Sequence, residues 1–453
     1  MVKTRFAPSP TGDLHIGGAR TALFNWLYAQ HNNGLFFFRI DDTDKTRSQK
    51  QFLKDIIINL TKLGIISHQD RIYQSNNISS HIYTAKKMLK TGAAYYCCAS
   101  RKEIDGFYQN NPGKKFVSPY RNKAFNKITG AVLRLKIPLQ GSIVLQDKVL
   151  GMITIQNKQI DDLILLRSNG SPTYILSSTV DDYNMGITNI IRGNDHLTNT
   201  FKQLHIIKSL NWDMPRFAHI PLILDKQGHK ISKRESHATI SKYFINGYLA
   251  NAFNNYMLGL GWSCKNETIV TIIEAQKIFD LKNISKSPSK FDIHKLNYLN
   301  RIYLRNTPDW QLYNIILQNL NIRENFLQSR VKQALPMIKS RCTTIIELIN
   351  LGKTYIYNNI LVDRNVQIIL HQYYAFNSKN MILKFANCKL WKLRNIERIC
   401  QKHAYQNHLN FSLILKILRV LIFYRIDSPP LFESMIILGK HEVLKRVTYP
   451  LPP

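Results

Sequence analysis

Residues 6–20 read FAPSPTGDLHIGGAR and connect a short extended run, 4–6, to a helical pattern. Pro8, Pro10 and Gly12 exclude regular structure from the first half of this stretch. The apolar residues of 19–31 then fall on one side of a helix, and 35–40 is an apolar run typical of a buried parallel strand. The order strand, glycine-rich loop, helix and strand is that of a βαβ unit, which predicts a doubly wound nucleotide-binding domain.

The same stretch has the features of a phosphate site. It ends at a helix start, where backbone N–H groups attract phosphate. His15 stands at that start and can donate a hydrogen bond to a phosphate oxygen, although a single histidine in this position is more often a cap. Gly17 and Gly18 lack side chains, so a base or a phosphate can approach the backbone closely. These features predict that the loop binds a nucleotide.

A second candidate segment is basic. Residues 230–234 read KISKR and follow the loop residues 225–228, so Lys230 and Lys233 can face one polyphosphate. Ammonium groups held there stabilise the charge that grows on the leaving oxygens of a phosphoryl transfer. Alone, the string indicates little, because most such strings are solvated loops.

Together the two segments carry a family resemblance. Residues 6–20 resemble the HIGH region of glutamyl-tRNA synthetases almost position by position, and 230–234 resemble the KMSKS signature of class I synthetases. The resemblance to the bacterial type implies an α/β fold: a Rossmann-like class I catalytic domain with an α+β insertion, followed by an all-helical C-terminal anticodon-binding region. It also implies that L-glutamate is activated with ATP and transferred to the 3′-terminal adenosine of tRNA(Glu).

The resemblance implies site residues at the matching positions. The implied catalytic residues are His15, Lys230 and Lys233. The implied ATP-binding residues are His15, Gly17, Gly18, Asp195, Ile223, Lys230, Ile231, Ser232, Lys233 and Arg234. The implied glutamate-binding residues are Arg5, Ala7, Ser9, Asp41, Tyr174 and Arg192. Arginines suit this substrate because they only donate hydrogen bonds, which favours carboxylate over the amide of glutamine.

One position departs from the family pattern. The family has RIEDTD, with the glutamate receiving the substrate ammonium, whereas residues 39–44 read RIDDTD. Asp41 keeps the charge but is one methylene shorter, so its ion pair is expected to stretch or to become water-bridged. We expect weaker binding of free glutamate, with the chemistry retained.

The chain is expected to divide into four parts. Residues 1–75 and 171–225 form the catalytic domain, and 76–170, with strands at 131–137 and 151–155, form an insertion that binds the acceptor end. Residues 226–305 form a stem-contact region with the KMSKS-like loop, and 306–453 form the helical anticodon-binding region. The basic candidates for RNA contact are Arg101, Lys102, Lys114, Lys115 and Arg121 in the insertion and Arg341 in the helical region.

Composition favours a polyanionic partner. The 453 residues hold 62 Lys plus Arg against 29 Asp plus Glu, a formal charge of +33, although an AT-biased genome would also supply lysine. No apolar run reaches the roughly 18 residues of a membrane helix, and no leader is seen, so no membrane partner is expected. Six scattered cysteines fit a reducing cytoplasm.

The expected cofactors are ATP and the Mg²⁺ that accompanies it. Some relatives carry a zinc knuckle in the insertion, but here Cys97 and Cys98 are adjacent and the next cysteine is Cys264. A closed zinc site needs four spaced ligands, so no structural zinc is expected.

Two alternatives remain. A glutamyl-queuosine tRNA(Asp) synthetase shares the catalytic half, but the residues after 306 argue against it. A catalytically silent tRNA-binding paralogue would lose phosphate-handling residues, yet His15, Lys230 and Lys233 are present. Whether tRNA(Gln) is also charged stays open. The resemblance implies a monomer, the usual state in the family.

Overall fold

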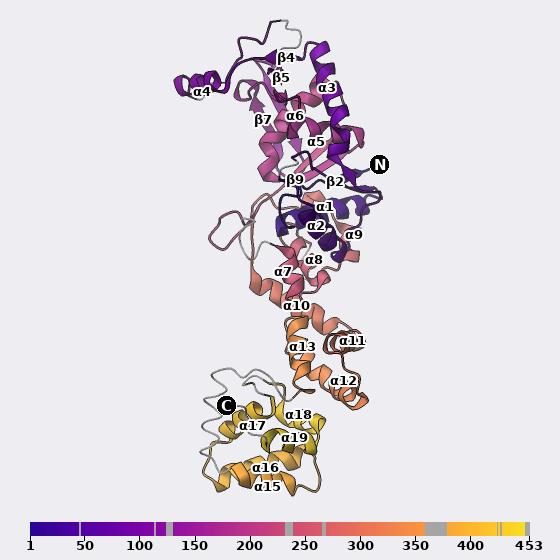
Figure 1. The fold of residues 1–453 in the computed structure, drawn as a ribbon, viewed down its shortest axis with the longest axis vertical. Helices are drawn as coiled ribbons and strands as arrows, with labels where there is room; N and C mark the ends of the chain where they lie inside the picture. Colours follow the sequence, from indigo (N-terminus) through magenta and orange to yellow (C-terminus); the bar gives the residue numbers. More distant parts are fainter. Residues whose placement is uncertain are drawn as a thin grey trace. The chain divides into compact units, whose positions relative to one another are not determined.

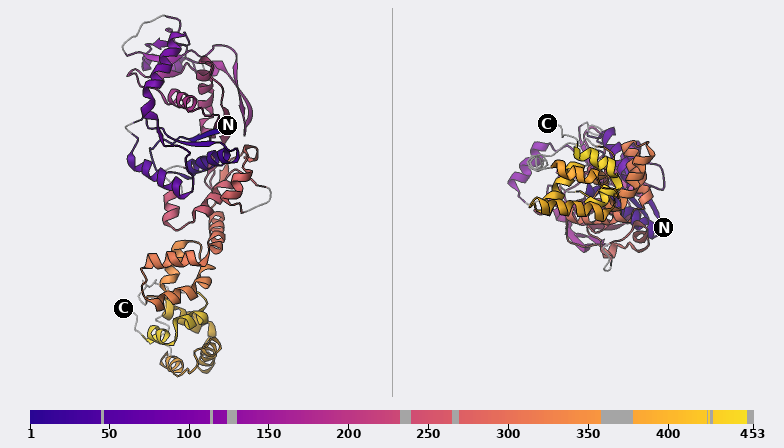
Figure 2. Two further views of the ribbon diagram at one scale, coloured as in Figure 1. Left: turned by 90° about the vertical axis from the view of Figure 1, so that its right-hand side faces the viewer. Right: turned by 90° about the horizontal axis from the view of Figure 1, so that it is seen from below.

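The computed structural model describes residues 1–44, 47–112, 115–123, 130–231, 239–264, 269–357, 378–423, 425 and 428–448. The chain forms two units. The N-terminal unit comprises Met1–Phe244 and Ala250–Lys295, and the C-terminal unit comprises Ile245–Leu249 and Leu296–Pro453. Figures 1 and 2 show both units.

The βαβ unit predicted at the N-terminus is confirmed. Strand β1 (Lys3–Phe6) pairs in parallel with β2 (Leu35–Ile40), and α1 (Ile16–His31) connects them. The helix begins three residues before residue 19, because the Nδ1 atom of His15 accepts the Gly18 N–H at 3.1 Å and caps it. Glycine is a weak helix former, so its pair at 17–18 suggested loop rather than first turn.

A second sheet has the order β7-β6-β10-β9. Strands β9 (Asn189–Gly193) and β10 (Arg216–Ile220) are parallel, and the hairpin of β6 (Ser142–Asp147) and β7 (Gly151–Gln156) joins β10. The Thr188 N–H donates to the Lys3 carbonyl at 3.1 Å, so β9 begins beside β1. The strand predicted at 151–155 is present as β7, and through β6 it shares a sheet with β9 and β10, which lie among residues expected in the catalytic domain.

Helices cover these strands. In Figure 1, β2 and β9 lie between α5 (Tyr174–Asn184) and α6 (Leu197–Ser209) on one side and α1 and α2 (Lys50–Lys62) on the other. A buried cluster that includes Val180, Phe201 and Phe217 joins α5, α6 and β10. Apolar burial on this scale is the main force that holds the layers together.

The rest of the N-terminal unit carries the remaining insertion and the segment after β10. The strand predicted at 131–137 is present as β5. An antiparallel sheet has the order β4-β5-β8, and the 101–110 helix α4 has no buried residue. These elements are β3 (Ile72–Tyr73), η1 (Gln74–Asn77), α3 (Ile78–Lys90), β4 (Ala94–Cys97), α4 (Arg101–Asn110), β5 (Val132–Leu135), η2 (Asn157–Gln159), β8 (Ile164–Leu166), η3 (Asn194–His196), β11 (Ile223–Leu224), α7 (Ile240–Ile245), α8 (Ala250–Leu258), α9 (Ile272–Ile278), η4 (Leu281–Asn283) and β12 (Ser289–Lys290). Helix α10 (Ile293–Asn306) begins in this unit, but most of its residues belong to the C-terminal unit.

The C-terminal unit is helical throughout its described residues, which confirms the prediction for the region after 306. Its helices after α10 are α11 (Asp309–Leu320), α12 (Asn325–Lys339), α13 (Ile345–Lys353), α15 (Ser378–Ala386), α16 (Leu393–Gln406), α17 (Phe411–Phe423), α18 (Leu431–Leu438) and α19 (Lys440–Thr448). They share one apolar core. Arg446 is buried in it and donates to the carbonyls of Thr354 (2.6 Å) and Ile422 (2.8 Å), so it joins the ends of α13 and α17 to α19. Among the helices of the described residues, none is long and apolar enough to cross a membrane.

Candidate active site

A cavity of about 700 Å³ lies in the N-terminal unit, where β1, β2 and β9 end. Ligands of open α/β sheets bind at the carboxyl ends of the strands, and Arg5, Arg39 and Arg192 each come one residue before such an end. The predicted site residues that line the cavity are Arg5, Ala7, Ser9, His15, Gly17, Gly18, Tyr174, Arg192, Asp195, Ile223, Lys230 and Ile231. Asp41 is buried beside this wall, whereas Ser232, Lys233 and Arg234 lie outside the described residues.

His15 enters the cavity wall as the cap of α1. Because its Nδ1 accepts the Gly18 N–H, the ring proton is on Nε2, which can donate to a phosphate oxygen. A Cβ on Gly17 would lie 3.2 Å from the Cε1 and Nδ1 atoms of this ring. The missing side chain at position 17 therefore lets the imidazole fold over the first turn of the helix.

Two arginines and two aspartates form a buried network under the cavity. The Nε and Nη2 atoms of Arg5 donate to Asp182 at 2.9 and 3.1 Å, and Nη1 of Arg39 donates to the same carboxylate at 2.6 Å. Nε of Arg39 donates to Asp41 at 2.7 Å. Charges this deeply buried persist only when paired. The network therefore fixes Arg5 and Arg39 in the cavity wall.

The pKa values of the network follow from this pairing. Burial acts to raise the pKa of Asp182, but Arg5 and Arg39 lower it below its ordinary value. Burial also raises the pKa of Asp41, against the attraction of Arg39. Burial acts to lower the pKa of Arg39, yet Asp41 and Asp182 raise it well above its ordinary value. Asp182 is thus the firmly ionised centre of the network.

Two side chains of α6 hold Arg192 in place. Its Nη2 atom donates to Thr200 (2.5 Å) and to Gln203 (2.6 Å), and burial lowers its pKa to about 10. Among the described residues, Nη1 of Arg192 is buried without a hydrogen-bond partner. A buried donor without a partner is costly, so this atom is suited to receive an anionic ligand.

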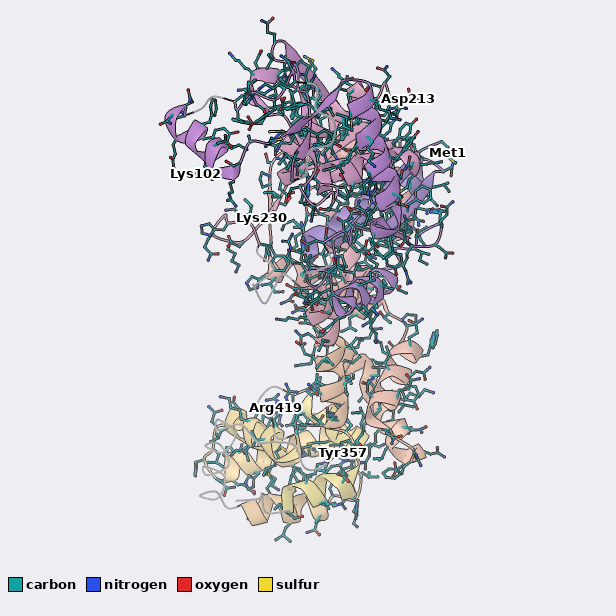
Figure 3. The ribbon with its side chains drawn as sticks, turned by 45° about the horizontal axis from the view of Figure 1, so that its top comes forward. Met1, Lys102, Asp213, Lys230, Tyr357 and Arg419 are labelled. Carbon is teal, nitrogen blue, oxygen red and sulfur yellow. The ribbon has the colours of Figure 1, made fainter. Side chains whose placement is uncertain are left out.

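Lys230, labelled in Figure 3, also lines the cavity. Its Nζ lies 2.7 Å from Oδ2 of Asp195, and both side chains are accessible to solvent. Burial acts to raise the pKa of Asp195, but the hydrogen bond from Lys230 and the nearby His196 lower it. Thr239 forms a β-bridge with His15. Of the described residues nearest to 232–238, Ile231 therefore lines the cavity and Thr239 pairs with a residue that lines it.

Sequence reasoning missed several residues of this site. Arg39 lines the cavity, and Asp182, Thr200 and Gln203 hold its arginines. One signal for Arg39 was present, because an arginine in an otherwise apolar strand requires a buried acidic partner. The identity of that partner was not readable, since Asp182 is 143 residues away.

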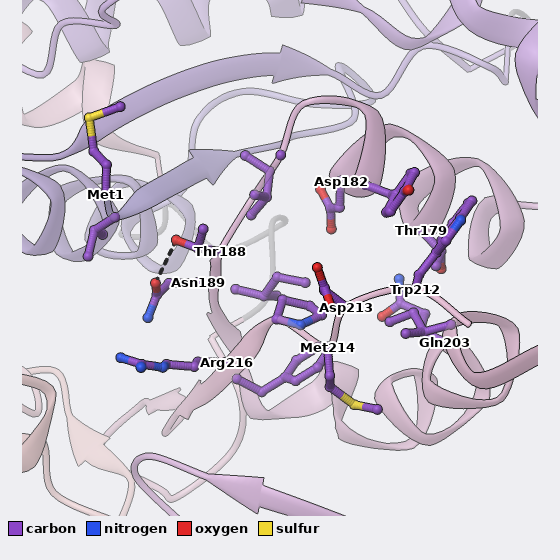
Figure 4. A pocket seen from close by; sticks show the side chains of 18 of the residues that line it. Met1, Thr179, Asp182, Thr188, Asn189, Gln203, Trp212, Asp213, Met214 and Arg216 are labelled. Carbon is purple, nitrogen blue, oxygen red and sulfur yellow. Dashed lines mark hydrogen bonds between the residues drawn. The ribbon is translucent and has the colours of Figure 1, made fainter. Parts of the chain in front are cut away.

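Figure 4 shows a second cavity, of about 590 Å³. Trp212, Met214 and Arg216 line it, together with Asp182 and Gln203. Because these last two also bind arginines of the first cavity, they form part of the wall between the two.

The basic candidates for RNA contact separate into two groups. Arg101 and Lys102 are exposed on α4, where Figure 3 labels Lys102. Lys115 and Arg121 turn inward to Asp162, with side chains 7% and 11% exposed, so they support the fold instead. Lys114 lies outside the described residues. In the C-terminal unit, Arg341 is exposed and donates to the Ser428 carbonyl at 3.2 Å.

Within the described ranges, no group of three or more His, Cys, Asp or Glu side chains could hold a metal ion. Cys97 is buried, with Sγ 3.3 Å from the hydroxyl of Ser118. The expectation that the chain holds no structural zinc stays a prediction.

The chain resembles known proteins along its length. Residues 1–298 match the family described as tRNA synthetases class I (E and Q), catalytic domain, and 311–450 match an anticodon binding domain. A protein of Ehrlichia chaffeensis named glutamate–tRNA ligase 2 is 40% identical over 461 residues, covering 99% of this chain and 98% of that protein. The glutamate–tRNA ligase of Pelagibacter ubique is 37% identical over 463 residues, covering 98% of each.

A solved structure shows the same similarity. The crystal structure of a glutamate tRNA ligase from Elizabethkingia meningosepticum, in complex with its amino acid, is 26% identical to this chain. It covers 98% of each chain with a TM-score of 0.82.

Proposed function

The chain belongs to the glutamate–tRNA ligases of the class I tRNA synthetase family, and we propose that the cavity at the ends of β1, β2 and β9 performs both steps of their reaction. The queuosine alternative is not supported, because the relatives named glutamate–tRNA ligase match the full length and 311–450 match an anticodon binding domain.

L-Glutamate is bound by the arginines. The observation that carries this assignment is the buried Nη1 of Arg192, which has no partner among the described residues, in a cavity that Arg5 also lines. Both guanidiniums only donate, so a carboxylate completes the site and an amide places its own N–H groups against donors. Ala7, Ser9 and Tyr174 complete the amino-acid pocket, and Asp41 attracts the ammonium group.

ATP lies at the helix start. The first turn of α1 with Gly17 and Gly18 receives phosphate, and Nε2 of His15 donates to a phosphate oxygen. Asp195 and Ile223 contact the nucleotide, and Lys230 and Ile231 face its phosphates. The corresponding roles of Ser232, Lys233 and Arg234 remain predictions from the sequence.

The first step joins these two substrates. A carboxylate oxygen of glutamate attacks the α-phosphorus of ATP, a new P–O bond forms, the bond to the β-phosphate oxygen breaks, and pyrophosphate leaves. His15 and Lys230 stabilise the charge that grows on the phosphate oxygens. Mg²⁺, when bound with ATP, supplies further neutralisation of that charge, and the phosphates themselves are its main ligands.

The second step transfers glutamate to tRNA. A hydroxyl of the 3′-terminal ribose attacks the carbonyl carbon of the adenylate, and AMP leaves. We propose tRNA(Glu) as the substrate, with α4 of the insertion near the acceptor end and the helical unit at the anticodon. We also propose that the enzyme acts as a monomer in the cytoplasm.

Charging assays test this function. Purified tRNA(Glu) and tRNA(Gln) are charged side by side with glutamate or glutamine, and ATP–pyrophosphate exchange is measured with and without tRNA. We expect charging of tRNA(Glu) with glutamate and none with glutamine. Charging of tRNA(Gln) with glutamate would show the wider tRNA range.

A matched substitution tests the site. Arg192→Lys keeps the charge but loses the planar donor pair, so the glutamate KM is expected to rise about tenfold or more, with the ATP KM little changed. No charging by the wild type contradicts the function and supports the silent-paralogue reading. An unchanged glutamate KM in the variant contradicts the assignment of Arg192.

A further inference from the structure

We propose that His219 and Asp147 are positioning residues, which orient Arg192 through Thr200 and so set the affinity for glutamate. The proposal rests on the proposed role of Arg192. It concerns a buried chain of contacts that runs away from the cavity into the β6–β7 hairpin.

The chain of contacts begins at adjacent strands. His219 on β10 is the register partner of Arg192 on β9 and is fully buried. Its Nε2 lies 2.8 Å from the Thr200 hydroxyl, and its Nδ1 lies 2.7 Å from Oδ2 of Asp147. The Thr200 oxygen in turn receives Nη2 of Arg192 at 2.5 Å.

Hydrogen-bond capacity gives this chain a direction. A carboxylate only accepts, so the proton of the imidazole is on Nδ1 and Nε2 is an acceptor. The single hydroxyl proton of Thr200 is then donated to Nε2 at 2.8 Å rather than to the more distant His196 carbonyl at 3.3 Å, and the oxygen lone pairs face Arg192. Asp147 thereby determines, through two intermediates, which face Thr200 presents to the guanidinium.

A second acceptor completes the arrangement at Nη2. Gln203 accepts from Nη2 at 2.6 Å, and its own amide nitrogen donates to Ser178 at 2.8 Å, which fixes its orientation. Thr200 and Gln203 together use both protons of Nη2. Nε of Arg192 donates to Nε2 of His219 at 3.5 Å. The buried Nη1 of Arg192, which has no partner among the described residues, is therefore the atom left for substrate.

Asp147, at the end of this series of contacts, is held by the β6–β7 hairpin. Oδ1 of Asp147 accepts the N–H groups of Val149 (2.9 Å) and Leu150 (2.8 Å). Burial acts to raise the pKa of Asp147, but the hydrogen bond from His219 lowers it, so the carboxylate is ionised.

His219 itself is neutral. Burial lowers its pKa, and Arg192 lowers it further, whereas Asp147 and Asp195 act to raise it. The nearby His196 has a lowered pKa as well, chiefly from burial. A neutral ring supplies the Nε2 acceptor that the chain requires.

Two substitutions of His219 separate positioning from packing. The amide of glutamine reaches the place of Nε2, whereas that of asparagine reaches the place of Nδ1. His219→Gln therefore retains an acceptor for Thr200, and His219→Asn retains the contact with Asp147 only. For charging, we expect His219→Asn and Thr200→Val to raise the glutamate KM about tenfold, the effect of one lost hydrogen bond to a charged group, with kcat and the ATP KM within about threefold of wild type. His219→Gln should stay within about threefold of wild type.

His205→Gln is the matched control. His205 is a buried histidine on α6, the helix of Thr200, and none of the described contacts joins it to Arg192. Its glutamate KM should equal that of the wild type. The unfolding temperature of each variant is measured alongside, so that a loss of folding is recognised.

The outcomes distinguish the two proposals. Equal glutamate KM values in His219→Gln and His219→Asn, or a fall in unfolding temperature with no change in KM, would overturn the positioning role. If Arg192→Lys raises the glutamate KM and His219→Asn does not, positioning fails while the proposed function stands. If Arg192→Lys has no effect, the proposed site itself fails.

Discussion

Asp41 shows how one methylene is expected to alter substrate affinity. The residue is 4% exposed, and its carboxylate is paired with Arg39, which also forms an ion pair with Asp182. Asp41→Glu would carry the negative charge toward the cavity, so we expect the glutamate KM to fall several-fold, the gain of a closer ion pair. Charging kinetics measure it, with Asp41→Asn as the variant that removes the charge and should raise KM. An unchanged or higher KM in Asp41→Glu contradicts the interpretation.

His205 provides a test of pH dependence. Burial lowers its pKa to about 4, below the ordinary 6.5. Between these values the unfolded histidine binds a proton and the folded one does not, so acidification lowers the free energy of unfolding by roughly 1 kcal/mol per pH unit from this residue.

Denaturant titrations across that pH range measure the effect. His205→Gln should give a shallower slope than the wild type. Identical slopes in the two proteins would show that His205 does not titrate in this way.

The start of helix α1 allows a test of how Gly17 and the His15 cap affect ATP binding. Alanine at a helical glycine usually stabilises by up to about 1 kcal/mol. A Cβ at Gly17, however, would lie 3.2 Å from the His15 ring. We therefore expect Gly17→Ala to retain or raise the unfolding temperature and to raise the ATP KM about tenfold, because the phosphate donor is displaced.

The control lies in α4. A Cβ at Gly106 meets nothing within 4 Å, so Gly106→Ala should gain stability and leave the ATP KM unchanged. If Gly17→Ala also leaves the ATP KM unchanged, the position of His15 is not what limits ATP binding.

Helices and strands could be predicted from the sequence better than the contacts between residues far apart in the chain. The βαβ unit was readable because proline, glycine and apolar spacing act locally, and the same holds for β5 and β7. The start of α1 was misplaced because a side-chain cap outweighs the low propensity of two glycines. The pairing of Arg5 and Arg39 with Asp182, and of His219 with Asp147, joins segments far apart in the chain, and no local pattern encodes such contacts.

At the scale of the whole molecule, two units with separate cores predict two unfolding transitions. Arg446→Met removes a buried guanidinium that donates to the carbonyls of Thr354 and Ile422 and pairs with Glu442, at a cost of about 3 kcal/mol or more. Calorimetry should show that only the transition of the C-terminal unit moves to lower temperature.

Lys445→Met is the matched control. It removes the same charge from an exposed position on the same helix and should leave both transitions in place. An equal shift of both transitions in Arg446→Met would mean that the units unfold as one.

The positions of Arg5 and Arg192 in the chain determine when the glutamate site forms during synthesis. Arg5 and Arg192 become neighbours only when the first strand of the chain lies beside a strand completed almost two hundred residues later. During synthesis on the ribosome, glutamate therefore cannot bind until most of the N-terminal unit has emerged and folded. Bound glutamate then stabilises the completed protein against heat and proteolysis but does not stabilise incomplete chains.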